Sequence, residues 1–225
     1  MVHLSNARFT SSGAERVRRR GEDRRRAILR AAGRVFRKRG FAAAGMREIA
    51  AEADLSPGNL YHYFKGKHEI LFFCQDRALD IMLSAVQAAR RSQEPAGRRL
   101  RAVLEAHLLC ILDDLEGAAA HLEVDALPDP LRNAIVAKRD RYERGIRQLI
   151  RQGVRDGVLA PCDVKLAGRA VLGAANWTAR WYRPDGPRSA AALARQMAGH
   201  LVAGLSRATP RHGARREAAG GRVRR

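Results

Sequence analysis

The sequence has few of the residues that support several common classes of protein. Only three of its 225 residues are cysteines, and Cys74, Cys110 and Cys162 are odd in number and lie far outside metal-ligand spacing. Each lies among apolar residues, so we expect three buried thiols in a reducing cytoplasm. No metal-ligating cluster, Gly-rich phosphate loop or pair of carboxylates in a defined cleft is recognisable. An enzyme is therefore disfavoured, and we expect no cofactor and no metal.

Long apolar runs and strand-like alternation are also missing. The first residues, MVHLSNARFTSSG, have no apolar signal-peptide core, and no stretch approaches the roughly 20 apolar residues of a membrane span. We therefore expect a cytoplasmic protein with no membrane partner. Apolar residues recur instead at helical spacing along the chain, which predicts an all-α fold.

Positive charge is abundant but unevenly placed. The formal net charge is +20, and residues 1–68 carry 16 basic and 6 acidic side chains. Residues 207–225 carry 7 and 1, whereas the 138 residues between these segments carry 20 and 16. This concentration indicates a polyanionic partner for the N-terminal third. An arginine-rich coding bias explains part of the charge on the remainder.

Both ends of the chain are predicted to be disordered and basic. Residues 1–23 are polar, contain Gly and Ser, and then become arginine-rich at Arg16, Arg18, Arg19 and Arg20. This arm is either simply solvated or follows the DNA backbone or a minor groove, and nothing in the segment decides between the two. Residues 207–225 are predicted to form a disordered basic tail.

Residues 24–68 are predicted to form a unit of three helices. The first helix is expected from about Asp23 to Arg39, with Gly40 ending it and Phe41 folding back onto the core. A second short helix follows from Met46, and a turn at residues 54–56 leads to a third. The core-facing positions are expected at Ile28, Ala31, Ala32, Val35, Phe36, Ile49, Ala50, Ala53, Leu60 and Phe64.

The third helix has the chemistry of a helix that reads DNA. Ser56 is a natural N-cap and Gly58 lets another backbone come close, so both join the candidate DNA contacts. Tyr63 could instead pack beside Phe64, and His62 could be a solvent-facing imidazole. The exposed positions carry hydrogen-bond donors and aromatic edges that suit a major groove, namely Asn59, Tyr61, His62 and Tyr63.

The segment LSPGNLYHYFKGKHEIL, preceded by RAILRAAGRVFRKRGFAAAGMREIA, closely resembles the DNA-binding domain of TetR-type bacterial transcriptional regulators. Departures from the family pattern are Gly45, where Ser or Thr is usual, and Asp54, where Gly is usual. We expect Gly45 still to cap the second helix and Asp54 to adopt the left-handed turn conformation. The resemblance implies base contacts from Arg47 and Asn59, mixed base and phosphate contacts from Tyr61, His62 and Tyr63, and a phosphate contact from Lys67.

Residues 69–206 are predicted to form a larger helical domain for ligand binding and dimerisation. We expect helices over about 67–91, from the 95–97 loop to Gly117, over 129–156 after an Asp129 cap, from Asp163, and over 189–207, with a further short one within 118–127. The last two have small and aliphatic faces, which suit either a four-helix dimer interface or the subunit's own core. A single recognition helix reads too few base pairs, which independently favours a homodimer.

The stretch NWTARWYRPDG, residues 176–186, contains both tryptophans. Trp177 and Trp181 share a helix face and Arg180 and Arg183 flank them, so they could hold a phosphorylated nucleotide or form a structural pair at a dimer interface. The pattern resembles TetR-type regulators that answer acyl-coenzyme A thioesters of lipid or steroid-ring catabolism. That resemblance implies a small-molecule effector with its acyl part inside the body. Three body residues complete the candidate ligand-binding set: Phe73, His107 and Cys110.

The resemblance thus implies a one-component transcriptional regulator acting as a repressor. A homodimer would bind double-stranded DNA at a palindromic operator and would be released by the effector. The alternative is an architectural DNA-binding protein that uses its arginine-rich ends and responds to no ligand.

Overall fold

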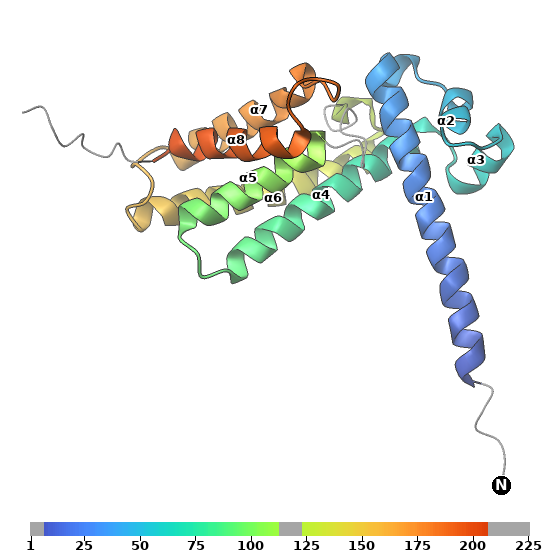
Figure 1. Ribbon diagram of the computed structural model, residues 1–225, viewed down its shortest axis with the longest axis horizontal. Coiled ribbons are helices and arrows are strands. Elements are labelled where there is room, and N and C mark those ends of the chain that lie inside the picture. Colours follow the sequence, from blue (N-terminus) through green and yellow to red (C-terminus); the bar gives the residue numbers. More distant parts are fainter. Residues whose placement is uncertain (1–6, 113–122, 207–225) are drawn as a thin grey trace, which may run out of the picture.

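The computed structural model describes residues 7–112 and 123–206, and these ranges contain eight α-helices, one short 3-10 helix and no strand. The all-α prediction is confirmed. Helices α1 to α3 gather at one end of the molecule, α5 to α8 form a bundle at the other, and α4 joins the two (Figure 1).

Helix α1 (Ala7–Ala43) begins much earlier than the sequence analysis predicted. We expected a disordered arm up to residue 23, but the described part of that arm, from Ala7 onward, is helical. The reason is local: Arg, Glu and Ala are strong helix formers, and Glu15 precedes Arg19 by the four residues that favour an ion pair on a helix. Residues 1–6 of the arm, and the predicted tail at 207–225, lie outside the described residues.

Gly40 ends the regular part of α1, as predicted. Its φ of 76° and ψ of 158° lie in a region that side-chain-bearing residues rarely adopt. The chain turns there, so that the buried Phe41 ring packs 5.4 Å from the Phe36 ring. The predicted return of Phe41 to the core is confirmed.

Helices α2 (Met46–Glu52) and α3 (Pro57–Tyr63) form the predicted helix-turn-helix pair. Asp54 turns the chain with a φ of 53°. Gly45 is the N-cap of α2, and its N–H donates to Glu48 Oε2 at 3.2 Å. At α3 the Ser56 Oγ accepts from the Asn59 N–H at 3.2 Å. The sequence therefore placed both helix starts correctly.

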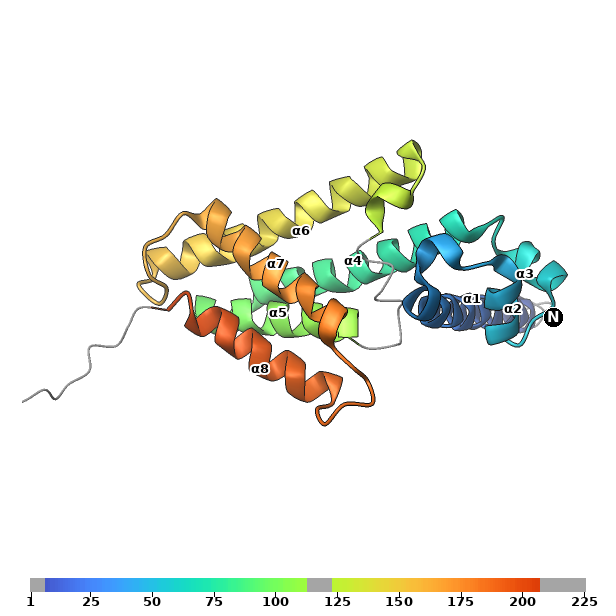
Figure 2. The ribbon, with the colours of Figure 1, turned by 90° about the horizontal axis from the view of Figure 1, so that it is seen from above.

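The body consists of α4 (Lys67–Arg91), α5 (Ala96–Leu112), α6 (Asp129–Arg155), α7 (Val164–Trp181) and α8 (Ala190–Ala203). Helix α5 is the centre of this bundle, because it contacts α4, α6, α7 and α8. Figure 2 shows α7 crossing over the bundle and α8 lying along its edge beside α5. These contacts bury both the apolar stripes and several polar side chains.

Some helix boundaries differ from the predicted ones by a few residues. Helix α5 starts inside the predicted 95–97 loop, α6 has Pro128 rather than Asp129 at its N-cap, and α8 ends at Ala203. Pro130 fits the first turn of α6, where its missing N–H is not needed. Residues 113–122, with the predicted stop at Gly117, lie outside the described part. A 3-10 helix, Val124–Ala126, stands at the end of the predicted short helix.

Helices α4 and α6 are held closely together at two levels. At one level a Cβ on Gly145 would come within 2.6 Å of Val86 Cγ1, so only glycine allows this approach. At the other, Lys138 Nζ lies 2.5 Å from Asp76 Oδ1 and 2.7 Å from Asp80 Oδ1. A movement of α6 therefore acts directly on α4, which leads into the helix-turn-helix unit.

The cysteines follow the sequence prediction only in part. Cys74 and Cys110 are buried, but Cys162 is exposed, so its predicted burial is wrong. Cys162 lies in the connection between α6 and α7, just before the Asp163 cap, where an apolar neighbourhood in sequence does not become a packed one. None of the described helices is both long enough and apolar enough to cross a membrane.

Candidate nucleic-acid interface and buried cavity

The polar face of α3 is uncovered, and its core face is completely buried. Leu60 has no exposed surface and Phe64 has 2%, whereas Tyr61 is 54% exposed. Apart from its chain neighbours and its own helix backbone, no described atom lies within 4 Å of a Cβ built on Gly58, so another molecule can approach its backbone. The predicted DNA contacts on α2, the turn and α3 are exposed together: Arg47, Ser56, Gly58, Asn59, Tyr61 and His62.

Tyr63 differs from its neighbours on α3. It is half-buried and packs against the core, which is the alternative that the sequence left open for it. Its carbonyl oxygen accepts from Arg25 Nη2 at 3.3 Å. A purely DNA-facing role therefore does not describe this side chain.

Lys67 is engaged by the protein itself. Its Nζ donates to the carbonyl oxygens of Phe41 at 3.1 Å, Ala42 at 2.9 Å and Ala44 at 3.2 Å. It also lies 4.8 Å from the centroid of the Phe41 ring. Carbonyls at a helix end lack partners within the helix, and a cation is a suitable one. The phosphate contact predicted for Lys67 would require it to leave these carbonyls.

Several arginines of α1 hold the helix-turn-helix unit together, a role that the charge count did not reveal. Arg24 Nη2 donates to the Asp54 carbonyl at 3.2 Å, and Arg34 Nε lies 2.6 Å from Glu52 Oε1. The Arg25 guanidinium lies 5.5 Å from the Phe64 ring centroid and 5.6 Å from that of Phe73. Part of the basic excess thus makes contacts within the protein itself.

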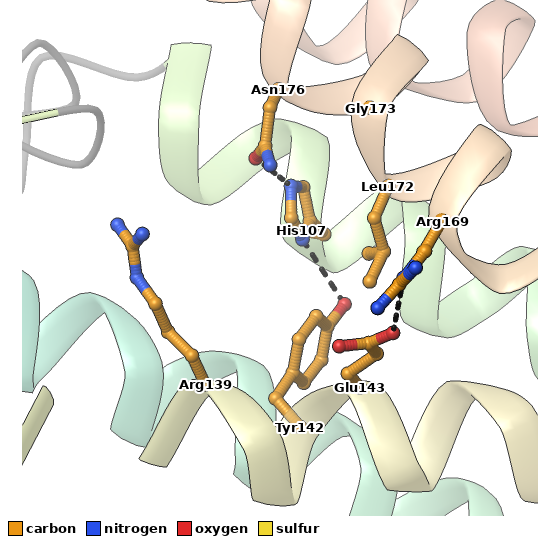
Figure 3. A pocket seen from close by; sticks show the side chains of 8 residues that line it. All are labelled: His107, Arg139, Tyr142, Glu143, Arg169, Leu172, Gly173 and Asn176. Carbon is orange, nitrogen blue, oxygen red and sulfur yellow. Dashed lines mark hydrogen bonds and ion pairs between the residues drawn. The ribbon is translucent and has the colours of Figure 1, made fainter. Parts of the chain in front are cut away.

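The body contains a cavity of about 260 Å³ between α5, α6 and α7 (Figure 3). Most of the side chains around it are polar, although the bundle around them is built on apolar stripes. The cavity is lined by His107, Arg139, Tyr142, Glu143, Arg169, Leu172, Gly173 and Asn176.

His107 is the centre of a buried hydrogen-bond chain in this cavity. Its Nε2 lies 3.0 Å from Asn176 Oδ1, and its Nδ1 lies 3.1 Å from the Tyr142 hydroxyl. An amide oxygen only accepts, so Nε2 carries the proton and Nδ1 accepts from the Tyr142 O–H. This leaves the Tyr142 oxygen lone pairs as acceptors for a further donor.

Burial keeps this chain uncharged. It lowers the pKa of His107 from 6.5 to about 4, and the charge of Arg139 acts in the same direction, while the Asn176 hydrogen bond opposes both. Burial also raises the pKa of Tyr142. At neutral pH the two rings are therefore a neutral imidazole and a neutral phenol.

Charged groups lie around this neutral chain. Burial lowers the pKa of Arg139 to about 10, so it remains a cation at neutral pH. Glu143 pairs with Arg147, and Arg169 Nε lies 3.9 Å from Glu143 Oε1. The cavity can therefore accept a polar or anionic group beside an apolar surface such as Leu172.

The predicted ligand residues do not meet at one site. His107 lines the cavity, but Cys110 faces α4, where its Sγ lies 3.7 Å from the Ala78 carbonyl oxygen. Phe73 packs edge-on to Phe64 at 5.8 Å, at the junction with the helix-turn-helix unit, so it is not a cavity residue. The sequence alone does not tell which neighbour each of these positions meets.

Apart from its first residue, the tryptophan stretch also lies outside the cavity. Trp177 is 64% exposed and Trp181 47%, and Arg180 is exposed as well. Trp181 and Arg183 line a separate hollow of about 250 Å³, together with Tyr182, Gly186, Pro187, Arg188 and Leu193. The residue of this stretch that does reach the cavity is Asn176, which the sequence analysis did not single out.

Helix α7 carries an uncovered apolar stripe. Leu166 is 67% exposed and shares one side of the helix with Trp177 and Trp181. Exposed Ala170 and Gly173 stand between them at helical spacing. An exposed apolar surface of this kind marks a contact with another molecule.

No group of three or more His, Cys, Asp or Glu side chains within residues 7–112 and 123–206 could hold a metal ion.

Comparison with known proteins gives a consistent result across both parts. The model "Bacterial regulatory proteins, tetR family" matches residues 28–72, and "Tetracyclin repressor-like, C-terminal domain" matches residues 93–205. The transcriptional repressor KstR2 of Rhodococcus jostii is 29% identical over 192 residues, which are 81% of this chain and 91% of that relative.

Solved structures show the same similarity. The TetR family regulator PfmR from Thermus thermophilus is 36% identical, with a TM-score of 0.70 over 80% of this chain and 99% of that one. AibR, solved with isovaleryl coenzyme A and operator DNA, is 26% identical, with a TM-score of 0.66 over 81% of this chain and 98% of that one. These relatives are named as regulators rather than enzymes. With a helix-turn-helix unit, a helical body and two matching family models, this chain belongs to the TetR family of bacterial transcriptional regulators.

Proposed function

We propose that this protein is a homodimeric repressor that binds a palindromic operator and leaves it when a small effector enters the cavity of α5, α6 and α7. The observation that carries the proposal is the buried His107 chain at this cavity, because ligand sites are cavities in which a few placed polar groups fix the ligand. In a DNA-binding regulator, such a cavity is a suitable binding site for a small effector.

The dimer is supported by the stripe on α7. Leu166, Trp177 and Trp181 would be buried if α7 and α8 packed against the same helices of a second copy. A two-fold axis would then present two copies of α3 to half-sites about 34–36 Å apart on one face of the duplex. Trp177 thus serves the interface, which is the structural alternative considered for it from the sequence.

The effector class follows from the size and polarity of the cavity. About 260 Å³ is below the roughly 300–1,000 Å³ usual for ligand sites, so it accommodates a short acyl group rather than a whole coenzyme. Arg139 or Arg169 would donate to a thioester or carboxyl oxygen. The nucleotide of an acyl-coenzyme A would remain outside, toward the arginines at the end of α7. The similarity to AibR, solved with isovaleryl coenzyme A, supports this class.

The signal would travel through α4. Lys138 precedes the cavity residue Arg139 on α6 and pairs with Asp76 and Asp80 of α4. The first residue of α4, Lys67, holds the end of α1. A shift of α6 on ligand binding would thus change the position of the helix-turn-helix unit. A coupling free energy on the order of 1–3 kcal/mol suffices for a functional response.

The test is thermal stability against a series of short-chain acyl-coenzyme A thioesters. We expect a rise in midpoint that depends on the acyl group, because a ligand that binds only the native state stabilises it. Coenzyme A alone and the free acids are the controls, since a protein of charge +20 attracts polyanions in general. His107→Leu should reduce the acyl-dependent part of the rise.

An equal rise with coenzyme A alone would contradict an acyl sensor. An absence of any response, combined with equal binding to unrelated DNA sequences, would instead support the ligand-independent architectural alternative.

A further inference from the structure

The first part of α1 is a helix that the fold of the subunit does not use. The helix begins at Ala7, and among its described side chains, at residue 13 and from residue 15 onward, Ile28 is the first that is fully buried. Residues 7–23, before the first arginine that contacts the helix-turn-helix unit, span about 25 Å at the usual 1.5 Å rise per residue. Figure 1 shows this stretch projecting away from α2 and α3, with no described element beside it. Val17, an apolar residue within this stretch, is 71% exposed.

The helical form gives the arginines of this stretch a definite arrangement. Arg16, Arg19 and Arg20 stand three and four residues apart, so they share one face, and all three are exposed. Like charges at this spacing destabilise an isolated helix by about 0.2–0.5 kcal/mol per pair. An exposed face of like charges with this cost suits a polyanion as its partner.

We propose that residues 7–23 of α1 lie along the phosphate backbone of the DNA that flanks each half-site. The proposal rests on the proposed function, because it needs α3 to be on DNA. DNA is the expected partner because this stretch continues into the part of α1 that packs against the helix-turn-helix pair. At 3.4 Å per base pair, about 25 Å of helix can follow roughly seven base pairs. Contacts of this kind add affinity without reading sequence.

The arrangement also distinguishes the stretch from the arginines deeper in α1. Arg24 and Arg25 already donate to the carbonyls of Asp54 and Tyr63. Their contacts keep the helix-turn-helix unit assembled. Arg16, Arg19 and Arg20 lie farther along α1 from these contacts, so replacing them leaves the hydrogen bonds of Arg24 and Arg25 in place.

The experiment compares two lengths of one operator. A duplex selected by the full-length wild-type protein from a random library is trimmed to the shortest form that keeps selective binding, and is then extended by about ten base pairs at each end. The variant is Arg16→Gln/Arg19→Gln/Arg20→Gln, since glutamine keeps the helix propensity. The control is Arg141→Gln/Arg144→Gln/Arg151→Gln, which removes the same charge from exposed positions of α6.

We expect the wild type and the α6 control to bind the extended duplex more tightly than the short one. The α1 variant should bind both lengths alike, with a log–log salt slope reduced by about 0.9 for each phosphate that it no longer neutralises. An α1 variant with the wild-type length dependence and salt slope would overturn the proposal, as would an equal loss in the α6 control. Failure of the wild type to select any sequence would instead contradict the proposed function.

Discussion

The two parts of the molecule keep their hydrogen-bonding side chains in opposite places. In the helix-turn-helix unit the interior is apolar, with Ile49 and Leu60 fully buried, and Asn59 and Tyr61 lie outside. In the body His107 is 1% exposed and Thr178 has no exposed surface. A unit that binds a large external partner keeps its polar groups outside. The body, proposed above to take up a small effector, keeps some of its polar groups inside, where they satisfy one another.

This contrast makes the body the acid-sensitive half, and the largest expected effect follows from it. The folded pKa of His107 is about 4, below its ordinary 6.5, so between these values the unfolded chain binds a proton that the native protein does not. The stabilisation from His107 is complete above pH 6.5 and is lost as the pH falls toward 4. We expect a loss of roughly 3 kcal/mol in the free energy of unfolding. Urea denaturation at several pH values measures it.

His107→Leu supplies the control for this titration, because other groups also respond to acid. The wild type should lose more stability than the variant between neutral pH and about pH 4.5. Equal losses in the two proteins would show that His107 is not the buried, neutral group that the structure describes.

The second prediction concerns the hydrogen-bond chain itself. At neutral pH His107→Leu should lower the free energy of unfolding by about 2 kcal/mol, because the buried Tyr142 hydroxyl loses its acceptor. Adding Tyr142→Phe should restore part of this loss, since removing both partners of a buried pair is less costly than removing one. Denaturation of the two single variants and the double variant forms the complete cycle. Simple additivity would mean that the two side chains are not coupled.

The same contrast explains what the sequence could and could not predict. The helix-turn-helix unit is specified by local signals, such as the Ser56 cap, the Asp54 turn and the stop at Gly40, and all three were predicted. The cavity joins residues that are 35 and 69 positions apart in the chain. A buried tyrosine at a stripe position of α6 has the same pattern as any apolar core residue, so only the packing of α5, α6 and α7 reveals its partner.

The start of α1 shows a different limit. Its residues have no apolar periodicity, which is the main signal used to recognise helices, and the presence of Gly and Ser favoured disorder. Helix propensity and charge spacing are weaker signals, and here the structure follows them. For Tyr63, by contrast, the sequence left packing against the core open as an alternative, and the structure shows that packing.

The third prediction tests whether Lys67 stabilises the helix-turn-helix unit or contacts DNA phosphate. Lys67→Met should lower the free energy of unfolding by about 1–2 kcal/mol, because the ammonium donates to three carbonyls at the end of α1. Lys65→Met, at an exposed side chain two residues earlier, should leave stability unchanged. Unchanged stability in Lys67→Met, together with weaker operator binding, would return Lys67 to the phosphate-contacting role implied by the family.

The smallest effect on stability is expected on the outer face of α3. Tyr61→Ala removes a side chain that is 54% exposed, so the free energy of unfolding should change by less than about 0.5 kcal/mol. Operator affinity should nevertheless fall by roughly tenfold or more, since removing a base-reading side chain costs about 1–3 kcal/mol.

The contrasting variant is Trp177→Ala, at a side chain that is 64% exposed on α7. It should weaken the dimer first, so that its loss of operator binding is reversed at higher protein concentration. The defect of Tyr61→Ala should persist at every concentration, because the dimer is intact and the side chain that meets the DNA is missing. If Tyr61→Ala dissociated the dimer, or if concentration restored its binding, the outer face of α3 would not be the surface that reads DNA.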